Sequence, residues 1–117
     1  MTVVAGVLVG IVAALHAYFL VLEMFLWRTP RVRATFGTTE SFANESASLA
    51  ANQGLYNGFL AAGLVWGLVA DNFGAKVFFL ACVVVAGLYG AVTANRRILF
   101  VQAVPGALAL GFVLLAH

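Results

Sequence analysis

Four long runs of hydrophobic residues, separated by short polar segments, make up almost the whole of this chain of 117 residues. The runs cover about residues 3–27, 47–70, 76–94 and 98–116. Each is close to the roughly 20 residues that an α-helix needs to cross the hydrocarbon core of a bilayer. Because most of the connections are short, consecutive spans should run antiparallel. The pattern therefore predicts a single all-α membrane domain, an antiparallel bundle of four transmembrane helices.

The composition strengthens this interpretation. Hydrophobic residues make up 64% of the chain and charged residues only 9%, whereas soluble domains carry about 25% charged residues. The first run lacks a preceding basic segment and is longer than the apolar core of a signal peptide, so we interpret it as a retained span. A net charge of +2 is too small to indicate nucleic-acid binding.

The basic residues predict the orientation in the membrane. Three arginines follow the first span, one lysine follows the second, and two arginines follow the third. Since loops rich in Lys and Arg stay in the cytoplasm, the first and third loops should be cytoplasmic and both termini outside. The predicted localisation is a membrane whose cytoplasmic side carries the two basic loops; the resemblance given below implies that this is the bacterial cytoplasmic (inner) membrane.

The longest connection, about residues 28–46, is polar and mixed in charge. Pro30 is expected to end the first helix, because a proline interrupts helical hydrogen bonding. Ser41 or Asn44 would cap a short interfacial helix or the start of the second span. In the last span, a kink is expected at Pro105–Gly106.

Polar residues within the spans gather toward the predicted cytoplasmic side, while the outer half is nearly featureless. Hydrocarbon offers no hydrogen-bonding partner, so such groups need one another or a ligand. We predict that they form a polar pocket near the cytoplasmic leaflet, which binds a small amphiphile or lipid. The predicted ligand-binding residues are Glu23, Asn52, Gln53, Tyr56, Asn57, Tyr89 and Gln102, with His16 deeper in the membrane.

Each of these residues also has a structural interpretation. Glu23 would form an ion pair with Arg28, Arg96 or Arg97, or carry a proton, or contact a ligand. His16 would be a neutral imidazole bonded to a neighbouring helix. A metal site would need further ligands, of which Glu23 is one candidate, but the sequence has no HxxxH or ExxH spacing. These alternatives stay open on the sequence alone.

The amides of the second span have the same ambiguity, because polar side chains also join membrane helices to one another. Its four glycines, Gly54, Gly58, Gly63 and Gly67, include pairs four residues apart, which let a neighbouring helix approach closely.

The chain has no hydrolase or nucleotide-binding motif, and its single Cys82 excludes an intrachain disulfide. We therefore predict no metal and no cofactor.

Three strings of the sequence resemble a family of small bacterial membrane proteins of unknown function with four predicted spans. The strings are LHAYFLVLEMFLWRTPRVRATFG, LAANQGLYNGFLAAGLVWGL and VAGLYGAVTANRRILFVQAVPGALAL. The resemblance covers most of the chain and implies a four-helix inner-membrane fold, without an established activity. The resemblance marks Glu23, Asn52, Gln53, Tyr56, Asn57 and Gln102 as positions within the family's characteristic strings.

The chain also resembles a second family in its layout. Both have an N-terminus outside, a basic first loop and a polar start to the second span. This second family is the membrane-associated eicosanoid and glutathione metabolism (MAPEG) superfamily, whose members are trimers of four-helix subunits that bind glutathione or lipophilic substrates between subunits. Its usual second-span motif has Arg, Ala, Asn and Glu. Here Asn52, Gln53 and Asn57 are present without the Arg or the Glu, a departure that counts against glutathione chemistry.

We favour a membrane protein, non-catalytic or of uncharacterised activity, that self-associates, binds membrane lipids and does not bind nucleic acid. Self-association is expected because the glycine-rich helices have more close-packing faces than one small bundle needs. The alternatives are a MAPEG-like enzyme acting on glutathione or a lipophile, an accessory subunit of a larger membrane complex, and a small proton-coupled transporter that uses His16 and Glu23.

Overall fold

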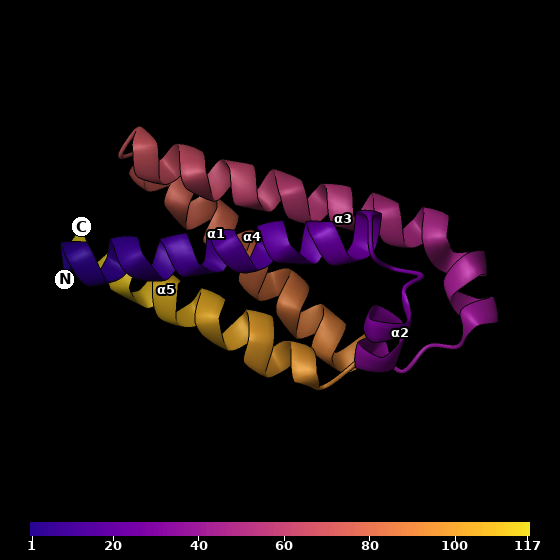
Figure 1. The fold of residues 1–117 in the computed structure, drawn as a ribbon. Helices are drawn as coiled ribbons and strands as arrows, with labels where there is room; N and C mark the ends of the chain where they lie inside the picture. The colour runs from indigo at the N-terminus through magenta and orange to yellow at the C-terminus, as the bar shows by residue number, and fades with distance from the viewer. The chain divides into compact units, whose positions relative to one another are not determined.

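The computed structural model describes residues 1–117, all of whose regular structure is helical (Figure 1). The elements are α1 (Thr2–Met24), α2 (Pro30–Phe36), α3 (Glu40–Val69), α4 (Phe73–Thr93), the π-helical turn η1 (Leu99–Ala103) and α5 (Val104–Ala116). Contacts divide the chain into two units: unit 1 contains Met1–Ala14 and Leu60–His117, and unit 2 contains Leu15–Phe59. The predicted all-α class is confirmed.

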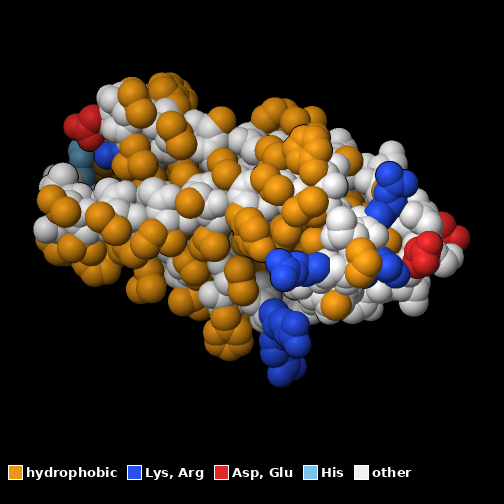
Figure 2. Space-filling view, in the orientation of Figure 1, with side chains coloured by type: hydrophobic (Ala, Val, Ile, Leu, Met, Phe, Trp, Pro, Cys, Tyr) orange, Lys and Arg blue, Asp and Glu red, His pale blue; other side chains and the backbone are white.

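Three helical stretches are long and apolar enough to cross a membrane: Thr2–Met24, Phe73–Thr93 and Leu99–Ala116. Many large hydrophobic side chains are exposed on these helices, and Figure 2 shows such side chains over much of the visible face. Exposed apolar surface of this extent is typical of contact with lipid. The chain is therefore a multi-pass helical membrane protein. The amides near the middle of α3 lower its hydropathy, and a fourth span there stays a prediction.

Unit 1 has an apolar core to which parts of α1, α3, α4 and α5 contribute. Val9, Leu64, Leu80, Val83 and Ala109 have no exposed surface. The chain termini lie at the same end of this unit (Figure 1). Small and branched side chains at these positions bring the helices of unit 1 into close contact.

Glycines set the close approach of α4 to η1 and α5. A Cβ added at Gly87 would lie 2.9 Å from the backbone nitrogen of Ala103, and one added at Gly106 would lie 2.8 Å from Cγ1 of Val83. The sequence predicts a kink at Pro105–Gly106, and the structure has the π turn η1 immediately before it. There the Val104 amide donates to the Leu99 carbonyl, and the following proline has no amide hydrogen to offer.

The turn between α3 and α4 is stabilised by its own side chains. Asn72 caps α4 by accepting a hydrogen bond from the Ala75 amide at 2.9 Å. Asp71 has a positive φ of 48° and forms an ion pair with Lys76 at 2.9 Å. Because the cap is at Asn72, α4 begins at Phe73, slightly earlier than the start predicted near Lys76.

Unit 2 begins with the second half of α1, which ends at Met24 rather than near Trp27. The expectation that Pro30 ends the first helix is wrong, because Pro30 is the first residue of α2. Thr29 caps this helix, with its hydroxyl accepting from the Val32 amide at 3.4 Å. Proline suits this position, where its missing amide hydrogen has no helical partner in any case.

Helix α3 begins seven residues before the predicted span. Thr39 accepts a hydrogen bond from the Phe42 amide at 3.1 Å and so caps the helix, and α3 starts at Glu40. The expectation of a cap at Ser41 or Asn44 is wrong, since both lie inside the helix. The segment between the first two predicted spans is thus mostly helical, and little of it is loop.

The glycines of α3 act in two pairs. In unit 2, an added Cβ would lie 2.7 Å from Cγ of Met24 at Gly54 and 2.6 Å from Cδ1 of Leu20 at Gly58, so this pair faces α1. In unit 1, the later pair packs on α4, with Gly63 against the ring of Phe79 and Gly67 against Lys76. The predicted role of these glycines in close helix packing is confirmed.

A polar pocket at the end of α1

Glu23 lies in the last turn of α1, within unit 2, and its carboxylate is held by α3. The side-chain amide of Asn57 donates a hydrogen bond to Oε1 of Glu23 at 2.5 Å. Both side chains are partly buried. The contact is possible because Gly54, one turn before Asn57, allows α3 to approach the Cβ of Glu23. The structure therefore brings together two of the predicted site residues.

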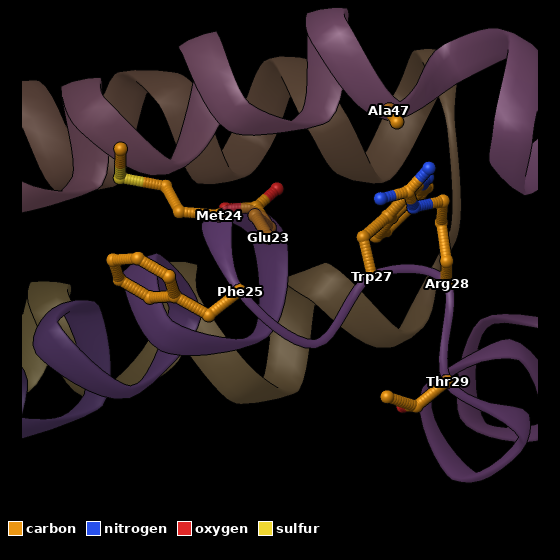
Figure 3. A pocket seen from close by; sticks show the side chains of 7 residues that line it. All are labelled: Glu23, Met24, Phe25, Trp27, Arg28, Thr29 and Ala47. Atoms are coloured by element: carbon orange, nitrogen blue, oxygen red, sulfur yellow. The ribbon is translucent and has the colours of Figure 1, made fainter.

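A pocket of about 340 Å³ opens beside this pair (Figure 3). It is lined by Glu23, Met24, Phe25, Trp27, Arg28, Thr29 and Ala47. In Figure 3 the side chains of Glu23, Trp27 and Arg28 extend toward α3, on which Ala47 lies, whereas Met24 and Phe25 extend to the left, away from Trp27 and Arg28. The lining thus combines an acid, a base and an indole with apolar side chains.

Trp27 forms a fixed wall of the pocket. Its indole Nε1 donates to the hydroxyl of Ser46 at 3.0 Å, and that hydroxyl donates to the Phe42 carbonyl at 2.7 Å. The indole also packs on the ring of Phe36, with centroids 5.1 Å apart. These contacts hold the turn after α1 against both α2 and α3.

The two charged groups of the pocket do not neutralise each other. The one ion pair in the structure joins Lys76 to Asp71, so the Glu23–Arg28 ion pair that the sequence left open does not form. Oε2 of Glu23 has no protein partner, since the only hydrogen bond of this carboxylate is the one from Asn57. The guanidinium of Arg28 is exposed. Both charges are therefore available to a ligand.

Three further predicted site residues of unit 2 do not join the pocket. Asn52 and Gln53 are exposed, and Tyr56 is 53% exposed with its ring near that of Phe59. The next residue, Gly54, packs against Met24, the last residue of α1. Asn52 and Gln53 therefore lie at the level where α1 ends, where an amide can reach headgroups or water.

The remaining predicted site residues have other surroundings. His16 has no exposed surface, and its ring meets the edge of Phe19 with centroids 5.2 Å apart. In unit 1, Gln102 donates from Nε2 to the Val83 carbonyl at 3.0 Å, which joins η1 to α4. Tyr89, on α4, is 71% exposed. Gln102 thus has the role of an interhelical contact.

Sequence reasoning missed most of the pocket lining. Trp27, Thr29 and Ala47 were not among the predicted site residues, and Arg28 was considered only as a topology signal and as an ion-pair partner of Glu23. Both Trp27 and Arg28 lie within five residues of Glu23 and beyond the end of α1. A sequence signal did exist, because Trp and Arg directly after an intramembrane acid combine three groups that contact polar headgroups.

A second pocket, of about 350 Å³, lies in unit 1 and has a different character. Its lining residues are Thr2, Ala5, Gly6, Asp71, Phe73, Lys76, Val113, Ala116 and His117. Its charged side chains, Asp71 and Lys76, already form an ion pair, and the ring of His117 stacks on Phe73 at 3.7 Å. This pocket therefore offers a ligand fewer unused groups than the pocket beside Glu23.

Comparison with known proteins places the chain among proteins without an assigned activity. Residues 10–114 match the profile of a family described as a protein of unknown function (DUF1304). The chain is also similar to the uncharacterized protein YpaA of Lactococcus lactis subsp. lactis (strain IL1403), with 28% identity over 106 residues. That alignment covers 87% of this chain and 89% of YpaA. No solved structure matches.

Proposed function

This chain belongs to the DUF1304 family, and on that premise we propose that it is a four-span inner-membrane protein whose pocket beside Glu23 binds the polar head of an amphiphile. The observation that carries this proposal is the unused charge in the pocket. Glu23 and Arg28 line the same cavity without forming an ion pair with each other. Charged groups left unpaired near hydrocarbon are costly, so a polar ligand stabilises them.

Most of the pocket surface is polar, but the apolar residues that also line it support an amphiphile over a fully polar metabolite. Met24 and Phe25 contribute to the same cavity, and the neighbouring helix α1 is hydrophobic for most of its length. A ligand with a charged head and a hydrocarbon tail would place its head beside Glu23 and its tail along the surface of α1 in the lipid. The polar lining lies where the apolar helix ends, which is the depth of lipid headgroups.

The fourth span and the orientation belong to this proposal. From Leu55 to Val69, α3 has only one strongly polar side chain, Asn57, and this is satisfied by Glu23. Five of the six basic residues follow the predicted first and third spans, which supports a cytoplasmic position for the segment around Arg28. The pocket then opens to the cytoplasmic leaflet.

The test is thermal unfolding of the purified protein in detergent, with and without added lipid. A ligand that binds the folded state raises its melting temperature. We expect lipids to stabilise the native protein and to stabilise Glu23→Gln and Arg28→Gln much less. Glu45→Gln is the matched control, because Glu45 is exposed in the same unit and does not line the pocket. If lipid raised the melting temperature of all four proteins equally, the pocket would have only a structural role.

We also propose that the protein self-associates through α1. In unit 1, Gly6 and Gly10 lie one turn apart, and a Cβ added at either would meet nothing within 4 Å. Pairs of small residues four apart let two membrane helices approach closely. Unlike the glycines of α3, this pair is not used for packing within the chain, which supports a role in contact with another copy.

A further inference from the structure

The pocket beside Glu23 contains one anionic and one cationic side chain that are kept apart. Trp27 lines the same pocket, and its indole is held by Ser46 and Phe36. Asn57 holds the carboxylate from the other side. Because the carboxylate forms no ion pair with Arg28, the pocket offers both signs of charge to a ligand and is complementary to one that carries both.

The geometry points to a phosphoethanolamine head, and we infer that the amphiphile is a lipid of this class, an inference that rests on the proposed function above. The ligand's primary ammonium would donate to Oε2 of Glu23, and its phosphate would accept from the guanidinium of Arg28. Arginine matches phosphate geometry well, because its planar guanidinium can donate two parallel hydrogen bonds.

The position of Glu23 favours a cation at this point for a second reason. Glu23 is the penultimate residue of α1, and the last carbonyl groups of a helix carry the negative end of its dipole. An ammonium group beside Glu23 therefore meets both a carboxylate and this partial charge. An anionic head without an ammonium would instead face repulsion from both.

The chemistry also distinguishes a primary from a quaternary ammonium. A primary ammonium has three hydrogens to donate, and Oε2 of Glu23 is an unused acceptor. A choline head carries the same charge but has no hydrogen on nitrogen, so it cannot form this bond. The pocket should therefore prefer phosphatidylethanolamine over phosphatidylcholine, and both over phosphatidylglycerol, which has no cation.

Binding of these three lipids, with identical acyl chains, tests the inference. The purified full-length protein in detergent is titrated with each lipid, and the bound lipid is counted by native mass spectrometry. We expect phosphatidylethanolamine to bind about tenfold more tightly than phosphatidylcholine, the ratio that one additional charge-assisted hydrogen bond provides. Glu23→Gln should reduce this ratio to about twofold, because a neutral amide oxygen replaces the carboxylate.

Arg28→Gln should weaken phosphatidylethanolamine and phosphatidylglycerol alike, since both present a phosphate. Arg31→Gln is the matched control, because Arg31 is an exposed arginine of the same segment that does not line the pocket. Soluble phosphoethanolamine serves as a competitor without acyl chains. If it displaces the lipid at comparable concentration, the ligand is the free head group and the lipid assignment is overturned. If it does not, a lipid is the ligand.

The outcomes separate this inference from the proposed function. Equal affinity for the three lipids, with loss of all binding in Arg28→Gln, would overturn the phosphoethanolamine assignment and leave an amphiphile pocket. Binding of no lipid, or binding unchanged by both pocket substitutions, would overturn the proposed function as well. A preference for phosphatidylethanolamine that falls in Glu23→Gln, together with weaker binding of all three lipids at an unchanged preference in Arg28→Gln, supports both.

Discussion

Asn57 of α3 donates its side-chain amide to the carboxylate of Glu23 of α1, across 34 residues of sequence. The bond joins two helices at the point where Gly54 allows them to touch. It leaves the second carboxylate oxygen of Glu23, a residue that lines the pocket, without a protein donor. One residue thus contributes both to packing and to a binding surface, and the predictions that follow separate these two roles.

Asn57→Ala should destabilise the protein by about 1–3 kcal/mol, because it leaves a partly buried carboxylate without its donor. The measurement is the free energy of unfolding during titration with a denaturing detergent. Asn52→Ala is the control: Asn52 is an exposed asparagine on the same helix, and its loss should change the unfolding free energy by less than about 0.5 kcal/mol. Equal effects of the two substitutions would show that the hydrogen bond contributes nothing.

Replacing both partners should separate stability from binding. The double variant Glu23→Leu with Asn57→Leu removes donor and acceptor together, and such exchanges of a buried polar pair for apolar side chains are often nearly neutral. We expect its unfolding free energy to lie within about 1 kcal/mol of the native value. Lipid should no longer raise its melting temperature. A lipid-dependent shift that survives in this variant would remove Glu23 from the binding site.

Trp27 should report ligand binding directly. In a Trp66→Phe background it is the only remaining tryptophan, and its indole lines the pocket. Lipid placed beside the ring changes the polarity of its surroundings, so the emission maximum should move on titration. The reference is the complementary Trp27→Phe variant, in which the remaining Trp66 lies outside the pocket and should keep a constant emission maximum.

The sequence predicted which segments are helical far better than where the helices end. Hydrocarbon solubility requires long apolar runs, so α1, α4 and the η1–α5 segment were visible from composition. Helix ends depend on individual caps, and several residues of the first connection are able to act as caps. Thr29 and Thr39 are the caps that form, and they convert most of a predicted loop into α2 and the start of α3.

The candidate site was predicted only in part for a related reason. Sequence gives the depth of a polar residue along a helix, and for Glu23 and Asn57 similar depth did correspond to contact. It does not give the rotation of the helix about its own axis, which decides whether that side chain faces a neighbouring helix or the surface. Asn52 and Gln53 are exposed, and Gln102 donates to the Val83 carbonyl, because local packing of each helix decides its rotation.

Glycine substitutions should have opposite effects at two positions of unit 1. At Gly87 an added methyl would lie 2.9 Å from backbone nitrogen of Ala103, so Gly87→Ala should force η1 away from α4 and cost about 1–3 kcal/mol. At Gly111 it would meet nothing within 4 Å, and Gly111→Ala should gain up to about 1 kcal/mol from helix propensity. Unfolding in detergent measures both. Similar stability of the two variants would contradict the close contact at Gly87.

Self-association through α1 predicts that Gly10→Leu lowers the oligomeric mass without unfolding the chain. The added side chain has space within its own subunit, since a Cβ at Gly10 meets nothing within 4 Å, but it would hold a second helix away. Sedimentation in detergent measures the mass, and helicity measured by circular dichroism monitors folding. Gly111→Leu, equally unhindered within the chain, should keep the native mass. If Gly10→Leu also keeps it, the α1 face is covered by lipid, and self-association through this helix is excluded.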